Sequence, residues 1–290
     1  MRLPKLSTRF VTLLAAVPLL GLGMAAPATA LGSPPGSAPA PRSAPESSAA
    51  LGAPALPPVD VPPVYPVPQQ LHSSGKPVRV GKHVTVVATG QSDEAAVAAV
   101  RAALKAAGAE DVSVVDSAEQ VPPQDTAIYV GGPDTVPGVG DVLRSLGVAD
   151  AAKLPAEGYV LATGRTGGRA SVVLDGHDAT GTFYAAQTLR QLLVGTGPQT
   201  EVPGIEVRDW PAYPLRGVIE GFYGTPWSHD ERLDLIRFCA DEGFDTWVHA
   251  PKDDPYHRAK WDEPYPDDEL ARLGELAAEA RRVDVEFAYA

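Results

Sequence analysis

The order of strand and helix signals in the last quarter of the chain constrains its fold most strongly. A buried strand pattern is followed by a loop, a helix opened by a serine–glutamate capping box, a second strand, a second loop, an amphipathic helix and a third strand pattern. Elements in this order normally form parallel strands joined by right-handed helical crossovers. The last helix is expected to bury a stripe formed by Leu270, Leu273, Leu276 and Ala280. Three parallel strands and two helices are therefore predicted, over residues 215–220, 228–243, 246–250, 267–282 and 283–290.

Residues 64–205 carry a longer alternation of strand and helix signals, which predicts an α+β or α/β layer domain. Ser92 is expected to cap a helix that ends at Gly108, and a second helix is expected over 180–194. The glycine-rich stretch 131–140 is interpreted as turns, because it lacks both a third glycine at the dinucleotide-binding spacing and a Gly-Lys-Ser/Thr sequence.

The first thirty residues are expected to be a signal peptide. A basic start is followed by an apolar run over 11–22 and by the small-residue cleavage site Ala28-Thr29-Ala30. The run is shorter than the about twenty residues that cross a bilayer, so no membrane span is expected. Residues 31–63 are rich in Pro, Ala and Ser and are interpreted as a disordered tether. These features predict a secreted, extracellular protein.

The composition excludes several classes of protein. Lys plus Arg total 24 against 36 for Asp plus Glu, a net charge of −12, which argues against nucleic-acid binding. The single cysteine, Cys239, permits no internal disulfide, and its place on an amphipathic helix predicts a core residue. His249 and His257 lack the i,i+4 helical spacing of a zinc motif, so they are interpreted as hydrogen-bonded loop residues and no metal site is expected.

Two polar, aromatic-rich loops follow the first two predicted parallel strands, over 221–227 and 251–257. Because the carboxyl ends of neighbouring parallel strands lie side by side, these loops are expected to meet over one end of the sheet. Aromatic rings pack well on the apolar faces of sugars, and Lys252 can donate to hydroxyl groups. The pattern alone leaves two interpretations open: a sugar site, or aromatic residues that only cover the end of a barrel.

The sequences RGVIEGFYGTPW (216–227) and APKDDPYH (250–257) resemble glycoside hydrolase family 84, which comprises β-N-acetylglucosaminidases, including O-GlcNAcases and enzymes labelled hyaluronidases. The preceding domain resembles the α+β domain found before hexosaminidase barrels. The residues that carry this second resemblance are VYPVPQ (64–69), EGYVL (157–161), GTFYAAQ (181–187) and DWPAYP (209–214).

The resemblance implies a (β/α)₈ barrel that removes β-linked N-acetylglucosamine from a glycan or glycoprotein with retention of configuration. In the family the substrate's own acetamide oxygen attacks the anomeric carbon and forms an oxazoline, a variant of the usual retaining scheme. One of two neighbouring aspartates orients the acetamide, and the other protonates the leaving oxygen. The resemblance implies no metal or organic cofactor.

Carried over residue by residue, the resemblance implies that the Gly221 carbonyl and the Lys252 ammonium bind sugar hydroxyls. Further residues that could line the cleft are Phe222, Tyr223, Asp253, Asp254, Tyr256 and His257. The family's aspartate pair follows a later strand, so it is expected beyond Ala290, and no catalytic acid is expected in this chain. Asp253 and Asp254 lie in the substrate-binding loop and are interpreted as loop-ordering residues rather than as the catalytic pair.

The predicted organisation is a signal peptide (1–30), a tether (31–63), an α+β hexosaminidase-type domain (64–205) and the first three of eight barrel strands (206–290). The chain is expected to be the front part of a larger glycosidase, inactive by itself. Two alternatives remain open: a non-catalytic carbohydrate-binding module that works through residues 64–205, and an envelope scaffold without glycan binding. The sequence identifies neither the natural glycan nor a protein partner.

Overall fold

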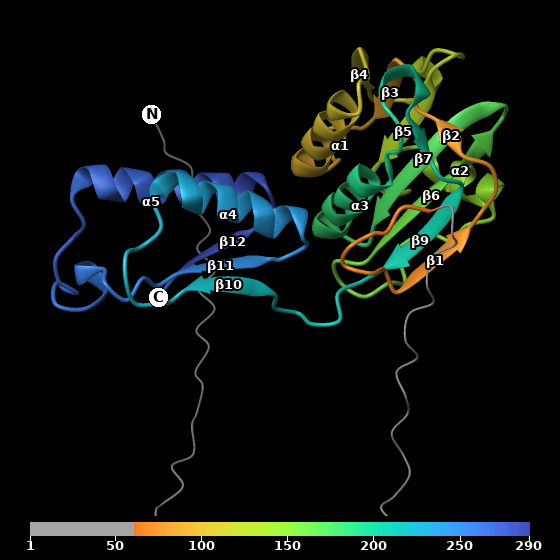
Figure 1. Cartoon of the computed structure of the whole chain (residues 1–290). Coiled ribbons are helices and arrows are strands. Elements are labelled where there is room, and N and C mark those ends of the chain that lie inside the picture. The colour runs from red at the N-terminus through yellow and green to blue at the C-terminus, as the bar shows by residue number, and fades with distance from the viewer. Residues whose placement is uncertain (1–60) are drawn as a thin grey trace, which may run out of the picture. The chain divides into compact units, whose positions relative to one another are not determined.

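The computed structural model describes residues 61–290 (Figure 1). The predicted signal peptide and nearly all of the predicted tether lie outside the described residues. The described residues belong to one compact unit. Within the described part, no helix combines the length and the apolar character needed to cross a membrane.

A seven-stranded mixed sheet is formed by strands between Gln70 and Asp209, the part of the chain called the first domain below. Its strand order is β1-β9-β6-β7-β5-β3-β4, where β3, β4, β5 and β7 pair in parallel and β6, β9 and β1 pair antiparallel. The strands are β1 (Gln70–Ser73), β3 (His83–Val87), β4 (Asp111–Val115), β5 (Thr126–Val130), β6 (Tyr159–Thr166), β7 (Arg169–Gly176) and β9 (Ile205–Asp209). A two-stranded ribbon pairs β2 (Val78–Arg79) with β8 (Glu201–Val202).

Three helices accompany this sheet: α1 (Glu94–Ala106), α2 (Val139–Leu146) and α3 (Ala179–Leu192). The expectation that Ser92 caps α1 is wrong. The cap is Asp93, whose carboxylate accepts the Ala96 N–H at 2.6 Å. The Ser92 hydroxyl instead donates a hydrogen bond to the Val130 carbonyl at 2.7 Å, and Val130 is the last residue of strand β5.

The glycine-rich stretch contains a helix start that the sequence interpretation missed. Gly138 has φ +86° and stands at the amino-terminal cap of α2, and Gly140 lies inside that helix. Val136, Val139 and Leu143 are buried at helical spacing, and this apolar periodicity was the available signal.

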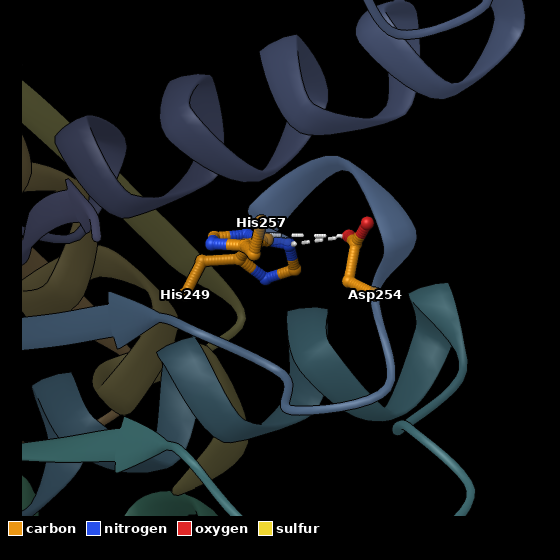
Figure 2. Close-up of side chains that lie close together, drawn as sticks. All are labelled: His249, Asp254 and His257. Atoms are coloured by element: carbon orange, nitrogen blue, oxygen red, sulfur yellow. Dashed lines mark ion pairs between the residues drawn. The ribbon is translucent and has the colours of Figure 1, made fainter. Parts of the chain in front are cut away.

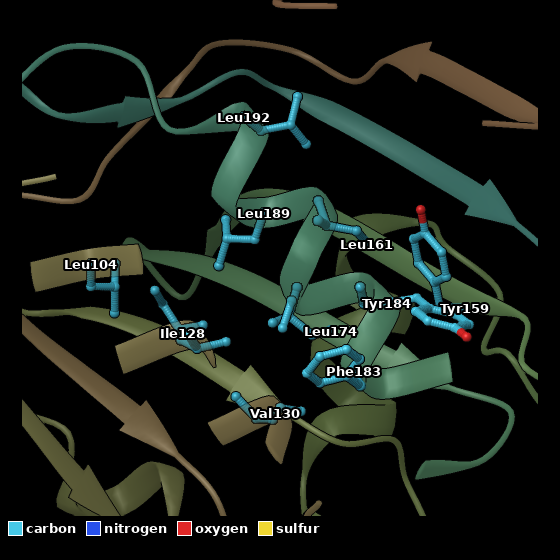
Figure 3. Packing of buried hydrophobic residues seen from close by; sticks show 14 of the residues in the cluster. Leu104, Ile128, Val130, Tyr159, Leu161, Leu174, Phe183, Tyr184, Leu189 and Leu192 are labelled. Atoms are coloured by element: carbon cyan, nitrogen blue, oxygen red, sulfur yellow. The ribbon is translucent and has the colours of Figure 1, made fainter. Parts of the chain in front are cut away.

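Helix α3 is buried on nearly every side. Its side chains share one apolar cluster with residues of β5, β6 and β7, as Figure 3 shows for Ile128, Leu161, Leu174, Phe183 and Leu189. A Leu→Ala change in such a core typically costs about 2–5 kcal/mol of unfolding free energy.

The second sheet confirms the predicted parallel arrangement. Strands β10 (Gly217–Glu220), β11 (Thr246–His249) and β12 (Glu286–Tyr289) pair in parallel in chain order, with α4 (His229–Asp241) and α5 (Asp267–Arg282) as crossovers. The predicted capping box is present: Ser228 Oγ accepts the Glu231 N–H, and the Glu231 carboxylate accepts the Ser228 N–H at 2.7 Å. Cys239 is fully buried, as expected.

One predicted core residue of α5 is exposed. Leu276 and Ala280 are buried, whereas Leu270 is 56% exposed. The helix packs against α4 and β12. Its buried stripe is therefore confined to its later turns, and the first turn, which carries Leu270, remains at the surface.

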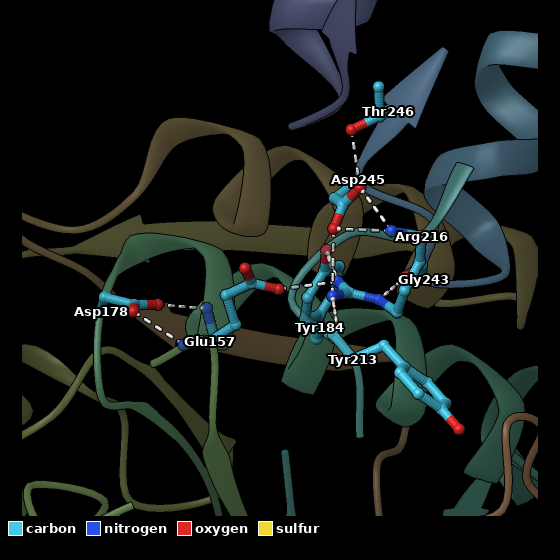
Figure 4. Close-up of polar contacts among 9 residues, drawn as sticks. Glu157, Asp178, Tyr184, Tyr213, Arg216, Gly243, Asp245 and Thr246 are labelled. Carbon is cyan, nitrogen blue, oxygen red and sulfur yellow. Dashed lines mark hydrogen bonds and ion pairs between the residues drawn. The ribbon is translucent and has the colours of Figure 1, made fainter. Parts of the chain in front are cut away.

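Arg216, immediately before β10, connects the second sheet with the first domain (Figure 4). One guanidinium nitrogen donates to Glu157 Oε2 at 2.7 Å and to the Tyr184 hydroxyl at 2.8 Å. The other side-chain nitrogens contact Asp245 Oδ2 at 3.0 Å and the Gly243 carbonyl at 3.0 Å. Because the Arg216 side chain is only 16% exposed, these charge-assisted contacts lie in a partly desolvated position.

Candidate functional site

The register of the second sheet places three residues in one row at its carboxyl end: Glu220, His249 and Tyr289. The loops 221–227 and 251–257 leave the first two of these neighbouring strand ends. They are joined by two hydrogen bonds, from the Lys252 N–H to the Phe222 carbonyl at 3.3 Å and from the Gly224 N–H to Asp253 Oδ2 at 2.9 Å. The two sequence motifs therefore form one surface.

Gly221 and Lys252 are the two residues predicted to bind sugar hydroxyls. The Gly221 N–H donates to the Ile219 carbonyl at 2.9 Å, so the chain turns tightly where β10 ends. A Cβ atom at Gly221 would lie 3.1 Å from Ile219 Cγ2, which leaves little room for a side chain. The Lys252 side chain is half-buried, and within residues 61–290 its ammonium makes no ion pair. That ammonium is free to donate to a ligand.

The aromatic residues of the first loop lie at the surface. Phe222 is 38% exposed and packs edge-on against Trp227, with ring centroids 5.0 Å apart. Tyr223 is 79% exposed. Exposed aromatic rings beside a hydrogen-bond donor are suited to a sugar, which has an apolar face and hydroxyl edges.

Asp253 and Asp254 make contacts that order the loop. Asp253 bonds the two loops together, as described above. Asp254 caps the 3₁₀ turn Pro255–His257 by accepting the Tyr256 N–H at 2.8 Å, and its other oxygen accepts the Tyr265 hydroxyl at 2.9 Å. Tyr256 packs on Tyr265 with ring centroids 4.4 Å apart. These contacts are consistent with the loop-ordering role that was predicted for the two carboxylates.

Glu220 is a buried charge that the sequence interpretation did not single out. Its side chain is fully buried and receives a bidentate contact from Arg232, at 2.8 and 2.9 Å. Burial raises the pKa of the Glu220 carboxyl, but the contacts with His249 and Arg232 outweigh burial and leave the pKa below its ordinary value. The available signal was an acid at the end of an apolar strand with an arginine on the following helix.

His249 and His257 come together although their sequence spacing argued against a shared site. Figure 2 shows both rings with the Asp254 carboxyl beside them. His249 Nε2 lies 3.9 Å from Asp254 Oδ2, and His257 Nε2 lies 4.0 Å from the same oxygen. The helical-spacing criterion does not apply here, because His249 ends a strand and His257 lies in the turn that follows. Burial lowers the pKa of His257.

A cavity of about 380 Å³ lies beside the second loop. Its lining includes Trp227, Asp253, Asp254, Tyr256 and Tyr265. Gly221 and Lys252 are not among its lining residues, so this cavity is distinct from the surface that carries the two predicted sugar-binding residues.

Two family models match the chain. The model for beta-N-acetylglucosaminidase matches residues 216–290, and the model for glycosyl hydrolase family 20, domain 2, matches residues 61–210. The first match contains both loops and their strands. The second contains the seven-stranded sheet and its helices.

Relatives show the same two parts. Protein O-GlcNAcase from Rattus norvegicus is 43% identical over 76 residues, which are 26% of this chain and 8% of the relative. The solved structure of CpGH84B is 30% identical with a TM-score of 0.63, over 78% of this chain and 36% of that chain. The structure of CpGH84D is 25% identical with a TM-score of 0.68, over 79% and 37%. The chain thus spans well under half the length of these relatives.

Proposed function

We propose that the chain supplies the front part of a β-N-acetylglucosaminidase, because it belongs to the hexosaminidase-type glycoside hydrolases that resemble family 84. One observation carries the proposal: the loops 221–227 and 251–257 are hydrogen-bonded into a single surface at the carboxyl ends of two parallel strands. In barrels built from such strands, this end carries the active site.

The proposed reaction is hydrolysis of a β-linked N-acetylglucosamine with retention of configuration. The substrate's acetamide oxygen attacks the anomeric carbon and displaces the leaving oxygen, which takes a proton from a carboxylic acid. Water then opens the oxazoline, and the same carboxyl group accepts the proton of that water. The first step needs a carboxylate that orients the acetamide N–H.

Within this scheme, the described residues bind and orient the sugar. The Gly221 carbonyl accepts from one hydroxyl, and the Lys252 ammonium donates to others. Phe222 and Tyr223 offer exposed rings to the apolar face of the sugar. The direct bond between Asp253 and Gly224 keeps the two loops at a fixed separation, so the Lys252 and Gly221 contacts act on the same ligand.

Neither Asp253 nor Asp254 is assigned as the general acid or as the carboxylate that orients the acetamide. Asp253 is committed to the Gly224 N–H, and Asp254 accepts from both Tyr256 and Tyr265. We propose that the acid and its partner carboxylate come from a later part of the barrel. The 290 residues alone are therefore expected to hydrolyse nothing, because general acid catalysis typically contributes about 10²–10⁴-fold.

The test is hydrolysis of a chromogenic aryl β-N-acetylglucosaminide by the 290-residue chain and by the same chain extended with the remaining barrel of a close homologue. The extended enzyme should be active. Its Lys252→Ala variant should lose about ten- to hundredfold in kcat/KM, because a hydrogen bond from a charged group contributes about 1.5–3 kcal/mol.

A matched control is Lys260→Ala, which removes an exposed lysine that lies over the Tyr256 ring. This variant should keep full activity. Full activity of Lys252→Ala would refute the assigned role of Lys252. Turnover by the short chain that disappears on mutation of Asp253 or Asp254 would show that this loop holds the catalytic pair.

We also propose that the protein is exported, on the basis of the basic, apolar and small-residue segments at residues 1–30. An extracellular β-N-acetylglucosaminidase would meet glycans and glycoproteins rather than intracellular substrates. Loss of residues 1–30, which carry Arg2, Lys5 and Arg9, changes the net charge from −12 to −15. This negative charge disfavours a polyanionic glycan, although a local groove can override net charge.

A further inference from the structure

Three potential metal ligands converge behind the second loop. His249 stands at the end of β11, and Asp254 and His257 begin and end the short 3₁₀ segment that follows (Figure 2). One ligand atom from each of the three lies within 4.8 Å of the other two. Two imidazoles and one carboxylate form a donor set that binds divalent transition metals, zinc above all.

The cluster is buried and not fully satisfied by the protein. The side chains of His249 and His257 are 2% and 8% exposed, and that of Asp254 is 15% exposed. His257 Nε2 is a buried nitrogen without a hydrogen-bond partner in the described part of the chain. It lies 4.0 Å from Asp254 Oδ2, beyond hydrogen-bond distance. A buried polar atom without a partner is costly, and a metal ion between these atoms would remove that cost.

The separations are compatible with one ion after a small closure. A zinc ion binds nitrogen and carboxylate oxygen at about 2.0–2.2 Å, so two tetrahedral ligands lie about 3.4 Å apart. The two distances to Asp254 Oδ2 are 3.9 and 4.0 Å. Each histidine nitrogen therefore needs to approach Asp254 Oδ2 by about half an ångström, and the two histidine nitrogens, which lie within 4.8 Å, need to approach each other by up to about 1.4 Å.

The surroundings of the cluster have the groups that usually orient metal ligands. Glu220 Oε2 lies 3.5 Å from His249 Nδ1, the ring nitrogen that does not face Asp254. His249 Nδ1 has no hydrogen-bond partner among the described residues, so Glu220 would need to come closer to fix the tautomer of a ligating histidine and to increase its basicity. Tyr265 donates to Asp254, and Tyr289 stacks on the His257 ring with centroids 4.4 Å apart.

We propose that His249, Asp254 and His257 bind one divalent transition-metal ion, with zinc as the best fit, and that water completes its coordination. The ion would hold loop 251–257 against the end of β11. Lys252 belongs to the same loop, but it takes no part in the coordination. The proposed metal site stands whether or not the proposed glycosidase function is correct.

The test uses the untagged 290-residue chain, freed of metal with a chelator and then titrated with ZnCl₂ by calorimetry. One equivalent of Zn²⁺ is expected to bind and to remain after dialysis. CoCl₂ gives a second measurement, because four-coordinate Co²⁺ absorbs visible light much more strongly than six-coordinate Co²⁺. An intense visible band is expected in the wild-type chain.

His257→Gln removes one ligand and keeps a side chain of similar size. Loss of a residue that only hydrogen-bonds a metal ligand weakens metal binding by about 10–100-fold. Loss of the ligand His257 should weaken zinc binding by more than this, and it should abolish the cobalt band. The matched control is His72→Gln, an exposed histidine in β1, which should leave both measurements unchanged. Circular dichroism of the metal-free variants checks that each one is folded.

Absence of stoichiometric zinc binding by the wild-type chain would overturn the proposal, and so would a weak, six-coordinate cobalt spectrum. Equal affinity of His257→Gln and wild type would place the ion elsewhere and would also refute it. Because all these measurements read metal binding directly, their failure is distinguishable from a failure of the glycosidase assay.

Discussion

Arg216→Met is a direct test of how the second sheet is attached to the first domain. The substitution keeps an unbranched side chain but removes the contacts with Glu157, Tyr184 and Asp245. Removing one partner of a fully buried ion pair costs about 3–5 kcal/mol, whereas an exposed pair contributes about 0–1 kcal/mol. Arg216 and Asp245 are each 16% exposed and Glu157 is 25% exposed, so we expect an intermediate loss of about 2–4 kcal/mol.

The assay is thermal unfolding of the 290-residue chain, followed by circular dichroism. For a domain of this size, each kcal/mol lowers Tm by about 2–4 °C, so Arg216→Met should unfold about 4–16 °C below the wild type. Arg216→Lys should recover little of the loss, because an ammonium cannot reproduce the planar fork that contacts several oxygens at once.

The matched control is Arg272→Met, which removes an exposed arginine paired with Glu269 three residues earlier in the same helix. A pair of this kind contributes a few tenths of a kcal/mol, so its Tm should change by less than about 2 °C. An equal, small Tm change for Arg216→Met and Arg272→Met would refute the conclusion that the Arg216 contacts stabilise the fold.

Two further predictions concern the first domain and the amino terminus. Burial raises the pKa of Asp175 from 3.8 to about 6, so its carboxylate lowers folded-state stability as pH rises from about 4 to above 6, by about 3 kcal/mol in total. Urea unfolding at several pH values should therefore show that the unfolding free energy of Asp175→Asn rises relative to that of the wild type across this interval. Unfolding free energies of the two proteins that change in parallel with pH would contradict the prediction. Export should cleave the chain after Ala30, and secreted protein that begins at Met1 would count against the signal peptide.

The parallel sheet was predictable because its signals are local. Each crossover helix carries its own cap and apolar period, as the Ser228–Glu231 box shows, and parallel strands joined by helices have few alternative arrangements. Strands β2 and β8 were not predictable, because each has two residues and its partner lies far away in sequence. A segment of two residues has no periodicity, so its strand conformation comes from tertiary pairing alone.

The candidate site was predictable to a similar extent. The meeting of the two loops follows from parallel pairing, which a sequence pattern can indicate. The contact of Glu220 with Arg232 does not follow from pattern, because nothing local shows that a strand carboxylate is buried and compensated from a helix twelve residues later. The approach of His257 to His249 likewise depends on the turn that Asp254 caps.

The alternation along the short strands places successive side chains on two different faces of the sheet. Residues paired side by side share a face, so Glu220 and His249 lie on the same face as buried Trp247, whereas Ile219, which is 64% exposed, lies on the other. Gly221 lies in the tight turn that ends β10, and because glycine has no side chain, a ligand can approach its backbone. The face beside the helices therefore holds Glu220 and His249, and Ile219 marks the open face of the sheet.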